Sequence, residues 1–153
     1  MADTIYDVLK KEHDEAKEIL EKLVATSTDD AKTRRDVGGK LIAELISHHE
    51  AESQTLYQRL MDFEDLRDHV EEHQDEHEEA NKELRALLDV DVEEAAWLER
   101  LKEIKEAVEH HIEDEEERLF PEAREHLDES EAEELAGQFE EEQTRRKELL
   151  KVA

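Results

Sequence analysis

Two short stretches of sequence decide how this chain folds. Residues 48–52 read His-His-Glu-Ala-Glu, and residues 110–115 read His-His-Ile-Glu-Asp-Glu. In each stretch a histidine is followed four residues later by a glutamate, a spacing that puts both side chains on one face of an α-helix. Such a pair can hold one metal ion or contribute to two adjacent ions. The two pairs are His48 with Glu52 and His111 with Glu115.

The sequence around these pairs is repeated as well. Residues 12–20 (EHDEAKEIL) match residues 76–84 (EHEEANKEL). The chain therefore reads as two copies of a helical hairpin, each with a lone histidine followed by one His-x-x-x-Glu pair. Leucine and an aromatic residue follow both pairs at the same distance, as Leu56-Tyr57 and as Leu119-Phe120.

Apolar residues recur at helical spacing over most of the chain, which contains only three glycines and one proline. Few turns are therefore available, and long helices joined by short connections pack as antiparallel neighbours. We expect an all-α fold, an up-down-up-down four-helix bundle over about residues 4–120 with an additional C-terminal helix over about 130–151. The helices of the bundle are expected to cover about residues 4–25, 31–60, 64–88 and 92–119.

Further signals predict where these helices begin and end. Asp3 or Thr4 is a plausible N-cap for the first helix. Pro121 is expected to end or kink the fourth helix, because proline lacks the backbone donor of a helix interior. Ser130 and Glu133 have the spacing of a capping box for the C-terminal helix.

Composition and charge limit the classes of function. The 153 residues fit one domain, 1–153, and carry a net charge of -27. We expect neither a nucleic acid nor an anionic membrane as a partner, because such a surface repels phosphate. No apolar run could span a bilayer and no signal-peptide pattern follows Met1, so a cytoplasmic location is the default expectation. The acidic excess also resembles the surfaces of proteins from salt-rich cytosols.

The apolar stripes of the helices are interrupted by polar residues that should be buried. On the fourth helix the stripe passes through His111 and Glu115, whereas His110 lies about 100° away and should face a neighbour or solvent. The same counting leaves His49 off the stripe of the second helix. Seven polar residues fall on the stripes: His13, His48, Glu52, His73, His77, His111 and Glu115.

Burying these groups without partners would be very costly. A single buried histidine is commonly a satisfied core residue, but five imidazoles and two carboxylates must satisfy one another or hold metal. Nitrogen and oxygen ligands without cysteine suit iron, manganese or zinc. The set exceeds the needs of one tetrahedral zinc, whereas two metals roughly 3.5–4 Å apart, bridged by both carboxylates, would use it all. Iron is favoured because such nitrogen-rich sites leave a position open for dioxygen.

At these residues the sequence resembles the hemerythrin-like, HHE cation-binding family over about residues 4–125. The resemblance implies an up-down four-helix bundle with two iron ions, bridged by carboxylate and by an oxo or hydroxo group. It implies ligands at His13 on the first helix, His48 and Glu52 on the second, His77 on the third with His73 as the second histidine of oxygen carriers, and His111 and Glu115 on the fourth.

Two departures from the family pattern bear on this ligand set. Many hemerythrins carry an aspartate one residue further on, at the position of Glu116, so both Glu115 and Glu116 stay open as the ligand. Gln58 stands where the family often has proline, which concerns the end of the helix more than the site.

The resemblance implies a protein that binds dioxygen or a related small ligand such as nitric oxide, as a carrier, sensor or store. The alternative is a di-iron enzyme, such as a peroxidase, an oxidase or a nitric-oxide-handling protein. Oxygen-activating di-iron sites usually carry more carboxylates, so five histidines with two carboxylates favour binding over catalysis. A bundle in which the metal is purely structural is a third interpretation.

Overall fold

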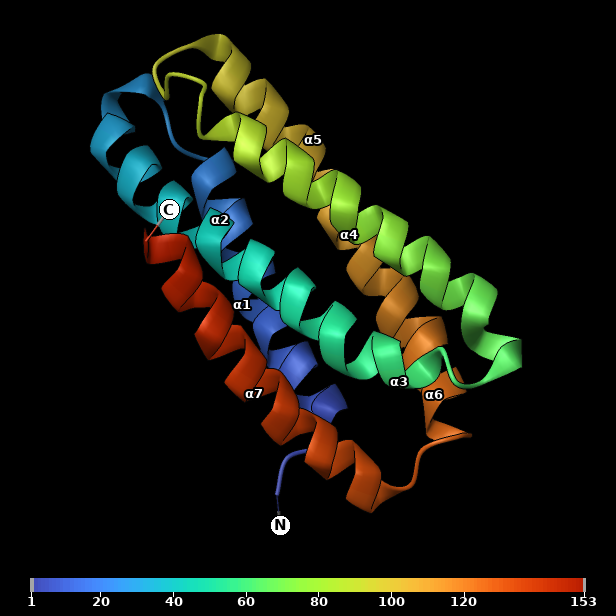
Figure 1. Cartoon of the computed structure of the whole chain (residues 1–153). Coiled ribbons are helices and arrows are strands. Elements are labelled where there is room, and N and C mark those ends of the chain that lie inside the picture. The colour runs from blue at the N-terminus through green and yellow to red at the C-terminus, as the bar shows by residue number, and fades with distance from the viewer. Residues whose placement is uncertain (1, 153) are drawn as a thin grey trace.

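The computed structural model describes residues 2–152, and its described elements are all helical (Figure 1). The expectation of an all-α bundle with an added C-terminal helix is confirmed. Two 3-10 turns, η1 (Thr28–Asp30) and η3 (Glu64–Leu66), lie in the connections. The long helices are α1 (Ile5–Val24), α2 (Ala31–Glu52), α4 (Arg67–Leu87), α5 (Ala95–Asp114) and α7 (Glu129–Val152).

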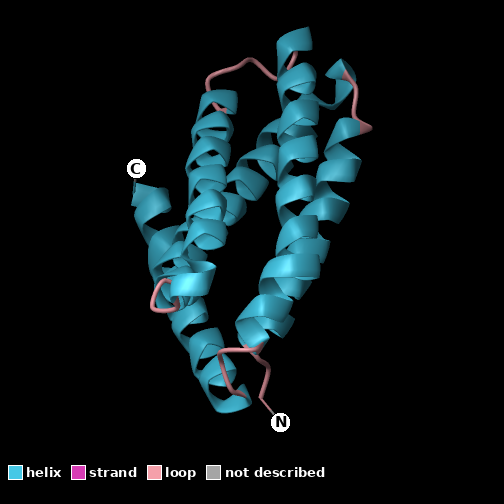
Figure 2. Ribbon diagram, turned by 90° about the vertical axis from the view of Figure 1, so that its right-hand side faces the viewer, coloured by secondary structure: helices cyan, strands magenta, loops and turns pink. Residues whose placement is uncertain are grey.

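The helices α1, α2, α4 and α5 form the four-helix bundle. Both α1 and α4 pack against α2 and α5, so α1 and α4 occupy opposite corners. The C-terminal helix α7 lies outside the bundle, along α1 and α2 and away from α4. Figure 2 shows that short loops join the long helices. One hairpin of the sequence repeat is therefore covered by α7, and the other is not.

A layer of polar side chains divides the hydrophobic core into two clusters. One cluster is built around Leu9 of α1 and Phe139 of α7, and the other around Leu20 of α1 and Trp97 of α5. On α1 the polar residue His13 lies between the members of the two clusters. Burial of apolar surface is the main favourable term in folding. The two clusters therefore stabilise the bundle and keep the layer between them away from water.

Both hairpins change from α-helix to π-helix beside their paired glutamates, directly after Glu52 in the first hairpin and at Glu115 in the second. The second helix continues through the π turn η2 (Ser53–Tyr57) and a last α turn, α3 (Gln58–Leu60). The helix α5 continues in the same way through the π turn η4 (Glu115–Leu119) into α6 (Phe120–Arg124). Such turns are frequent at functional sites.

We expected Pro121 to end or kink the helix. It does not end the helix, because helical structure continues to Arg124. Proline lies in the first turn of α6, directly after the π turn, where the hydrogen-bond pattern is already interrupted. A missing backbone donor costs little at such a position.

The predicted helix ends are partly right. Thr4 caps α1 in a capping box: its hydroxyl accepts from the Asp7 amide at 3.3 Å, and Asp7 accepts from the Thr4 amide at 3.0 Å. The capping box predicted at Ser130 is wrong, because α7 begins at Glu129. The Asp128 carboxylate accepts from the Glu131 amide at 2.8 Å instead, so an aspartate two residues earlier supplies the cap.

The start of α5 also differs from the expected position near residue 92. Residues 92–94 form a turn, in which the Glu93 amide donates to the Asp91 carboxylate at 2.8 Å, and α5 begins at Ala95. Aspartate favours such turns because its side chain can accept from the backbone two residues on. The buried guanidinium of Arg34 donates to the Val92 carbonyl at 2.7 Å and fixes this turn against α2.

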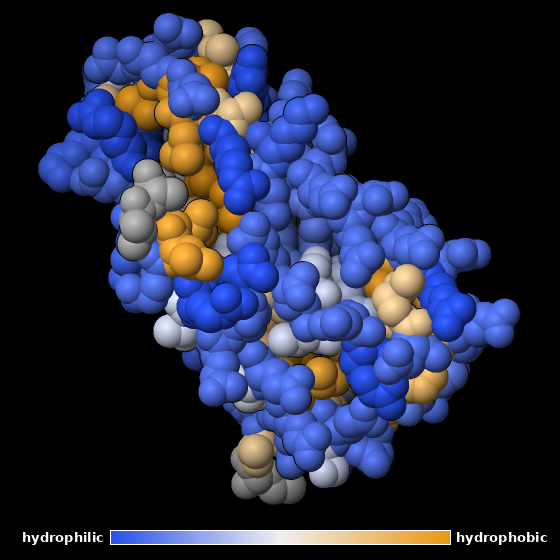
Figure 3. Space-filling view, in the orientation of Figure 1, coloured by the Kyte–Doolittle hydropathy of each residue, from blue (hydrophilic) through white to orange (hydrophobic). Residues whose placement is uncertain are grey.

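The surface is dominated by hydrophilic side chains. Figure 3 shows this on one face, with hydrophobic side chains gathered mainly near the end of α7 and the first turns of α2. Among the described residues, the large hydrophobic side chains that are exposed are Val37, Leu88 and Leu149. None of the described helices combines the length and the apolar character needed to cross a bilayer.

Candidate metal centre

The polar layer of the bundle contains all seven residues that the sequence analysis selects. Four helices and the first position of the π turn η4 contribute them, and each is at most 7% exposed. Their identity as ligands remains a prediction. The polar layer consists of His13, His48, Glu52, His73, His77, His111 and Glu115.

Two glutamates occupy the centre of this layer, and both are 0% exposed. From the first hairpin, His13 places Nε2 3.1 Å from an oxygen of Glu115, and His48 places Nε2 3.6 Å from an oxygen of Glu52. Two imidazoles of the first hairpin thus reach one carboxylate from each hairpin.

The second hairpin approaches the same glutamates from the other side. His77 Nε2 lies 3.2 Å from Glu52 Oε1 and 3.1 Å from His111 Nε2. His111 Nε2 in turn lies 3.9 Å from Glu115 Oε2. Nitrogen atoms of two further imidazoles therefore converge on the same pair of carboxylates.

The buried carboxylates lack enough hydrogen-bond donors. Neither oxygen of Glu52 has a hydrogen-bond partner, and Oε1 of Glu115 has none. Its other oxygen accepts a hydrogen bond from the Tyr57 hydroxyl. An ionised carboxylate buried in this way is costly unless it is paired or coordinates a metal. The chemistry of these donors therefore fits a bound cation.

The histidines of the two His-x-x-x-Glu pairs are fixed by carboxylates outside the layer. His48 Nδ1 donates to Glu12 at 3.0 Å, and His111 Nδ1 donates to Glu76 at 2.7 Å. Glu12 also accepts from Gln143 of α7 at 2.7 Å. A carboxylate on the second ring nitrogen orients a metal-binding imidazole and raises its basicity. Both histidines thus have the surroundings of a ligand.

The two lone histidines are held in a similar way. His13 Nδ1 donates to Glu116 at 2.7 Å, and His77 Nδ1 contacts the Ser53 hydroxyl at 3.0 Å. Glu115 and Glu116 both stayed open as the ligand, and they lie on different sides of His13. Glu115 faces its Nε2 atom inside the polar layer, whereas Glu116 faces its Nδ1 atom outside the layer.

Comparison with protein-family models gives a match over residues 4–123, to the hemerythrin HHE cation binding domain. The chain belongs to this family. Comparisons with curated proteins and with solved structures give no match. The donor sets of the polar layer fit the cation-binding character of the HHE domain. Three of these sets are His13, His48 and Glu52; Glu52, His77 and His111; and His73, His111 and Glu115.

His73 is placed differently from the other histidines of this HHE domain. Its Nε2 lies 2.6 Å from Asp114 and points away from the two glutamates, while its Nδ1 lies 3.4 Å from both His111 Nε2 and the Tyr57 hydroxyl. Any contribution of His73 to the central site would therefore use Nδ1.

The prediction for His110 holds, and His49, which lies off the main stripe of the second helix, is nevertheless buried. His110 is exposed. His49 is only 4% exposed, stacks on His77 with ring centroids 4.4 Å apart, and donates through Nδ1 to Asn81 at 2.8 Å. The helix α2 packs against α1, α4 and α7, so a residue rotated away from its main stripe is also buried.

Burial and hydrogen bonding set the pKa values of the buried groups in opposite directions. Burial lowers the pKa of His48, but the neighbouring carboxylates of Glu12 and Glu52 outweigh burial and raise the pKa to about 10. Burial raises the pKa of Glu52, but His48 outweighs it and lowers the pKa to about 2. Burial, reinforced by His111, holds the pKa of His77 well below its usual value.

Sequence reasoning did not select the groups that support the central histidines. Glu12 and Glu76 each precede a lone histidine and occupy matching positions of the repeat. This match was the sequence signal that could have identified them as supporting residues. Tyr57 stood out as an aromatic residue after the first pair, but its hydrogen bond to Glu115 depends on how the two hairpins pack together. Asp114 lies inside the second quoted stretch, and periodicity alone gave no reason to choose it.

Proposed function

We propose that this chain is a non-heme di-iron protein that reversibly binds dioxygen or a related small ligand. The observation that carries the proposal is Glu52, which is fully buried and has no hydrogen-bond partner on either oxygen. Glu52 belongs to one donor set with His13 and His48 and to another with His77 and His111. A carboxylate shared in this way suits a bridge between two metal ions.

Each ion would have its own histidines. His13 and His48 would hold one ion and His77 and His111 the other, with His73 as a further candidate. Glu115 would be the second bridging carboxylate. Reduced iron would supply the electrons that dioxygen binding requires. The chain itself orients the imidazoles through their outer nitrogens and encloses the site between two apolar clusters, which excludes water.

The composition of the donor set favours binding over catalysis, because histidines outnumber carboxylates. Tyr57 is the specific observation in favour of an enzyme, whether a peroxidase, an oxidase or a nitric-oxide-handling protein. Its hydroxyl lies 3.3 Å from His111 Nε2 and donates to Glu115, so a buried proton donor is next to the site. General acids in such positions assist reactions that need a proton.

Metal content and the visible spectrum test both proposals. Protein produced with iron should contain about two iron atoms per chain, by the pairing of ligands above. Its spectrum should change when the reduced form meets air and should return when oxygen is removed. Steady consumption of a reductant would favour the enzyme instead. One tightly bound zinc ion, with no affinity for iron, would contradict the di-iron proposal.

A further inference from the structure

A second group of metal-binding side chains lies beside the polar layer, towards the surface. His69 of α4 is one helical turn before His73, and Asp114 of α5 faces both. His69 Nε2 and His73 Nε2 lie 2.7 and 2.6 Å from the same oxygen, Oδ2 of Asp114. Two imidazole nitrogens and one carboxylate oxygen therefore converge on a single point.

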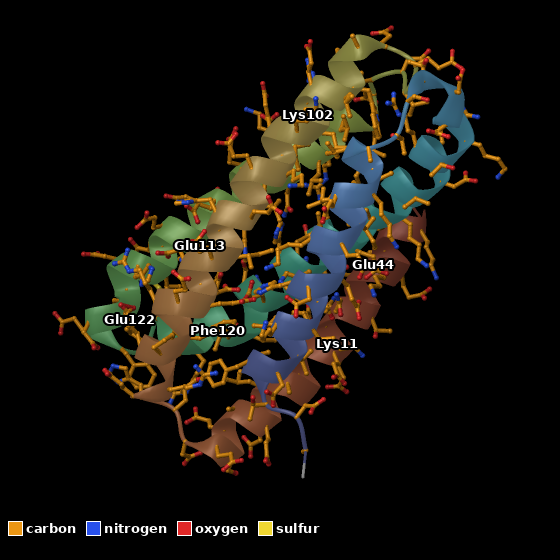
Figure 4. All side chains as sticks on the ribbon, turned by 180° about the vertical axis from the view of Figure 1, so that it is seen from behind. Lys11, Glu44, Lys102, Glu113, Phe120 and Glu122 are labelled. Atoms are coloured by element: carbon orange, nitrogen blue, oxygen red, sulfur yellow. The ribbon has the colours of Figure 1, made fainter. Side chains whose placement is uncertain are left out.

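The groups around this point hold its members in place. Glu122 of α6 accepts from Nδ1 of His69 at 2.7 Å, and Arg118 donates to the other oxygen of Asp114 at 3.3 Å. Figure 4 shows Glu122 close to the first turns of α4. A carboxylate on the outer nitrogen of a histidine is the usual support of a metal ligand.

The sequence repeat shows that only one hairpin carries these side chains. The positions that match His69, His73 and Asp114 in the first hairpin are Ile5, Leu9 and Ala51, and all three are 0% exposed in the apolar cluster beside α7. The second hairpin is not covered by α7, so polar residues are expected there. Solubility alone does not require two histidines and a carboxylate that meet at one oxygen.

We propose that His69, His73 and Asp114 form a separate site for one divalent transition-metal ion, with Glu122 orienting His69. Two imidazoles and one carboxylate leave the fourth position of a tetrahedral ion open. The donor atoms would move apart to roughly 3.3 Å to surround an ion at roughly 2.0–2.1 Å. The side chains of His69 and Asp114 are 12% and 21% exposed, so an ion can reach them from solvent.

This outer site is linked to the polar layer through one ring. An ion bound to Nε2 of His73 leaves its Nδ1 facing the Tyr57 hydroxyl and His111 Nε2, both at 3.4 Å. The charge of an ion in the outer site would therefore act, through the ring of His73, on the groups of the central site. The two sites remain separable, because His69 and Glu122 lie outside the polar layer.

Zinc binding tests the outer site without reference to the function of the central one. Iron-loaded protein is dialysed against increasing Zn²⁺, and zinc and iron are counted in the same samples. The expected result is one additional zinc per chain with the iron unchanged. In His69→Ala and Asp114→Asn this zinc should be lost, and in Glu122→Gln it should bind roughly tenfold more weakly or worse.

A matched control and a second sample keep the outcome clear. His126→Ala breaks a comparable pair with Asp65, 2.8 Å long, that shares no residue with the outer site, and should bind zinc as the unchanged chain does. Metal-free protein should bind about one zinc more than its His69→Ala variant, whichever metal the central site prefers. The proposal is overturned if His69→Ala binds the same zinc as the unchanged chain, or if zinc uptake is matched by loss of iron.

Discussion

The two hairpins of the repeat support each other reciprocally. In both, the glutamate before the lone histidine holds the histidine of the neighbouring helix, as Glu12 holds His48 and Glu76 holds His111. The residue after each paired glutamate instead contacts the lone histidine of the other hairpin. These contacts are Glu116 with His13 and Ser53 with His77.

The hairpins differ at two matched positions. Burial lowers the pKa of His13, but the neighbouring carboxylates of Glu115 and Glu116 outweigh burial and raise the pKa, whereas His77 faces the neutral Ser53. Tyr57 donates to Glu115, but the matched residue Phe120 has no hydroxyl to offer Glu52. A duplicated backbone thus gives two similar sets of candidate ligands, and single side chains make them electrostatically unequal.

The largest expected effect comes from removing a candidate ligand at matched positions of the two hairpins. His48→Ala and His111→Ala should each weaken iron binding by more than the roughly 10–100-fold that a supporting residue costs. His110→Ala is the control, because its side chain is exposed. Iron per chain after dialysis against a chelator measures the effect. Equal losses in all three variants would contradict the inward positions assigned to the two histidines.

Removal of the metal should destabilise the interface between the hairpins. A metal that binds only the folded state stabilises it by about 4 kcal/mol when its free concentration is about 1,000 times Kd. Without it, both oxygens of Glu52 and one oxygen of Glu115 are buried between the hairpins without a hydrogen-bond partner. Chemical denaturation of metal-free and iron-loaded protein measures the difference. Identical free energies of unfolding would show that the central carboxylates do not need a cation.

The supporting glutamates test whether the hairpins are equivalent. Glu12→Gln and Glu76→Gln should each weaken iron binding by roughly 10–100-fold, because a neutral acceptor supports the imidazole less well. Glu78→Gln, an exposed position on α4, is the control. Competition with a chelator gives the affinities. If only one of the two variants differs from the control, the reciprocal support inferred from the repeat fails.

The tyrosine difference should matter most in the metal-free protein. Tyr57→Phe leaves Glu115 without its hydroxyl donor and should lower the free energy of unfolding by about 1–3 kcal/mol. Phe120→Tyr makes the matched addition beside Glu52, and the repeat predicts that it raises stability instead. Denaturation of both metal-free variants provides the measurement. Loss of stability in both would mean that Tyr57 and Phe120 are not equivalent in orientation.

Salt should have the smallest effect and should not distinguish the hairpins. The net charge of -27 is spread along the chain, so screening should relieve repulsion and raise the melting temperature of the iron-loaded protein. Exposed ion pairs are worth only ~0–1 kcal/mol each, so their loss should not reverse the trend. A melting temperature that is flat or falling up to molar salt would oppose this prediction and the salt-rich habitat suggested by composition.

The sequence alone was enough to predict the helices, the duplicated hairpin and the residues of the polar layer. Periodicity identifies the buried face of a helix. Polar residues on that face, such as His13, His48 and His111, indicate a binding site because burying them without partners is costly. The repeat also showed which helix of one hairpin corresponds to which helix of the other. These properties follow from spacing along one helix, which the linear order of residues fully specifies.

Tertiary structure decided what each side chain meets across the bundle. His49 is buried because α7 and α4 enclose α2 from two sides, and Asp114 meets His69 and His73 because α5 packs against α4 without cover from α7. The π turn beginning at Ser53 could not be read from spacing either. Contacts between helices depend on their packing angle, rotation and register, and a periodic pattern fixes none of these.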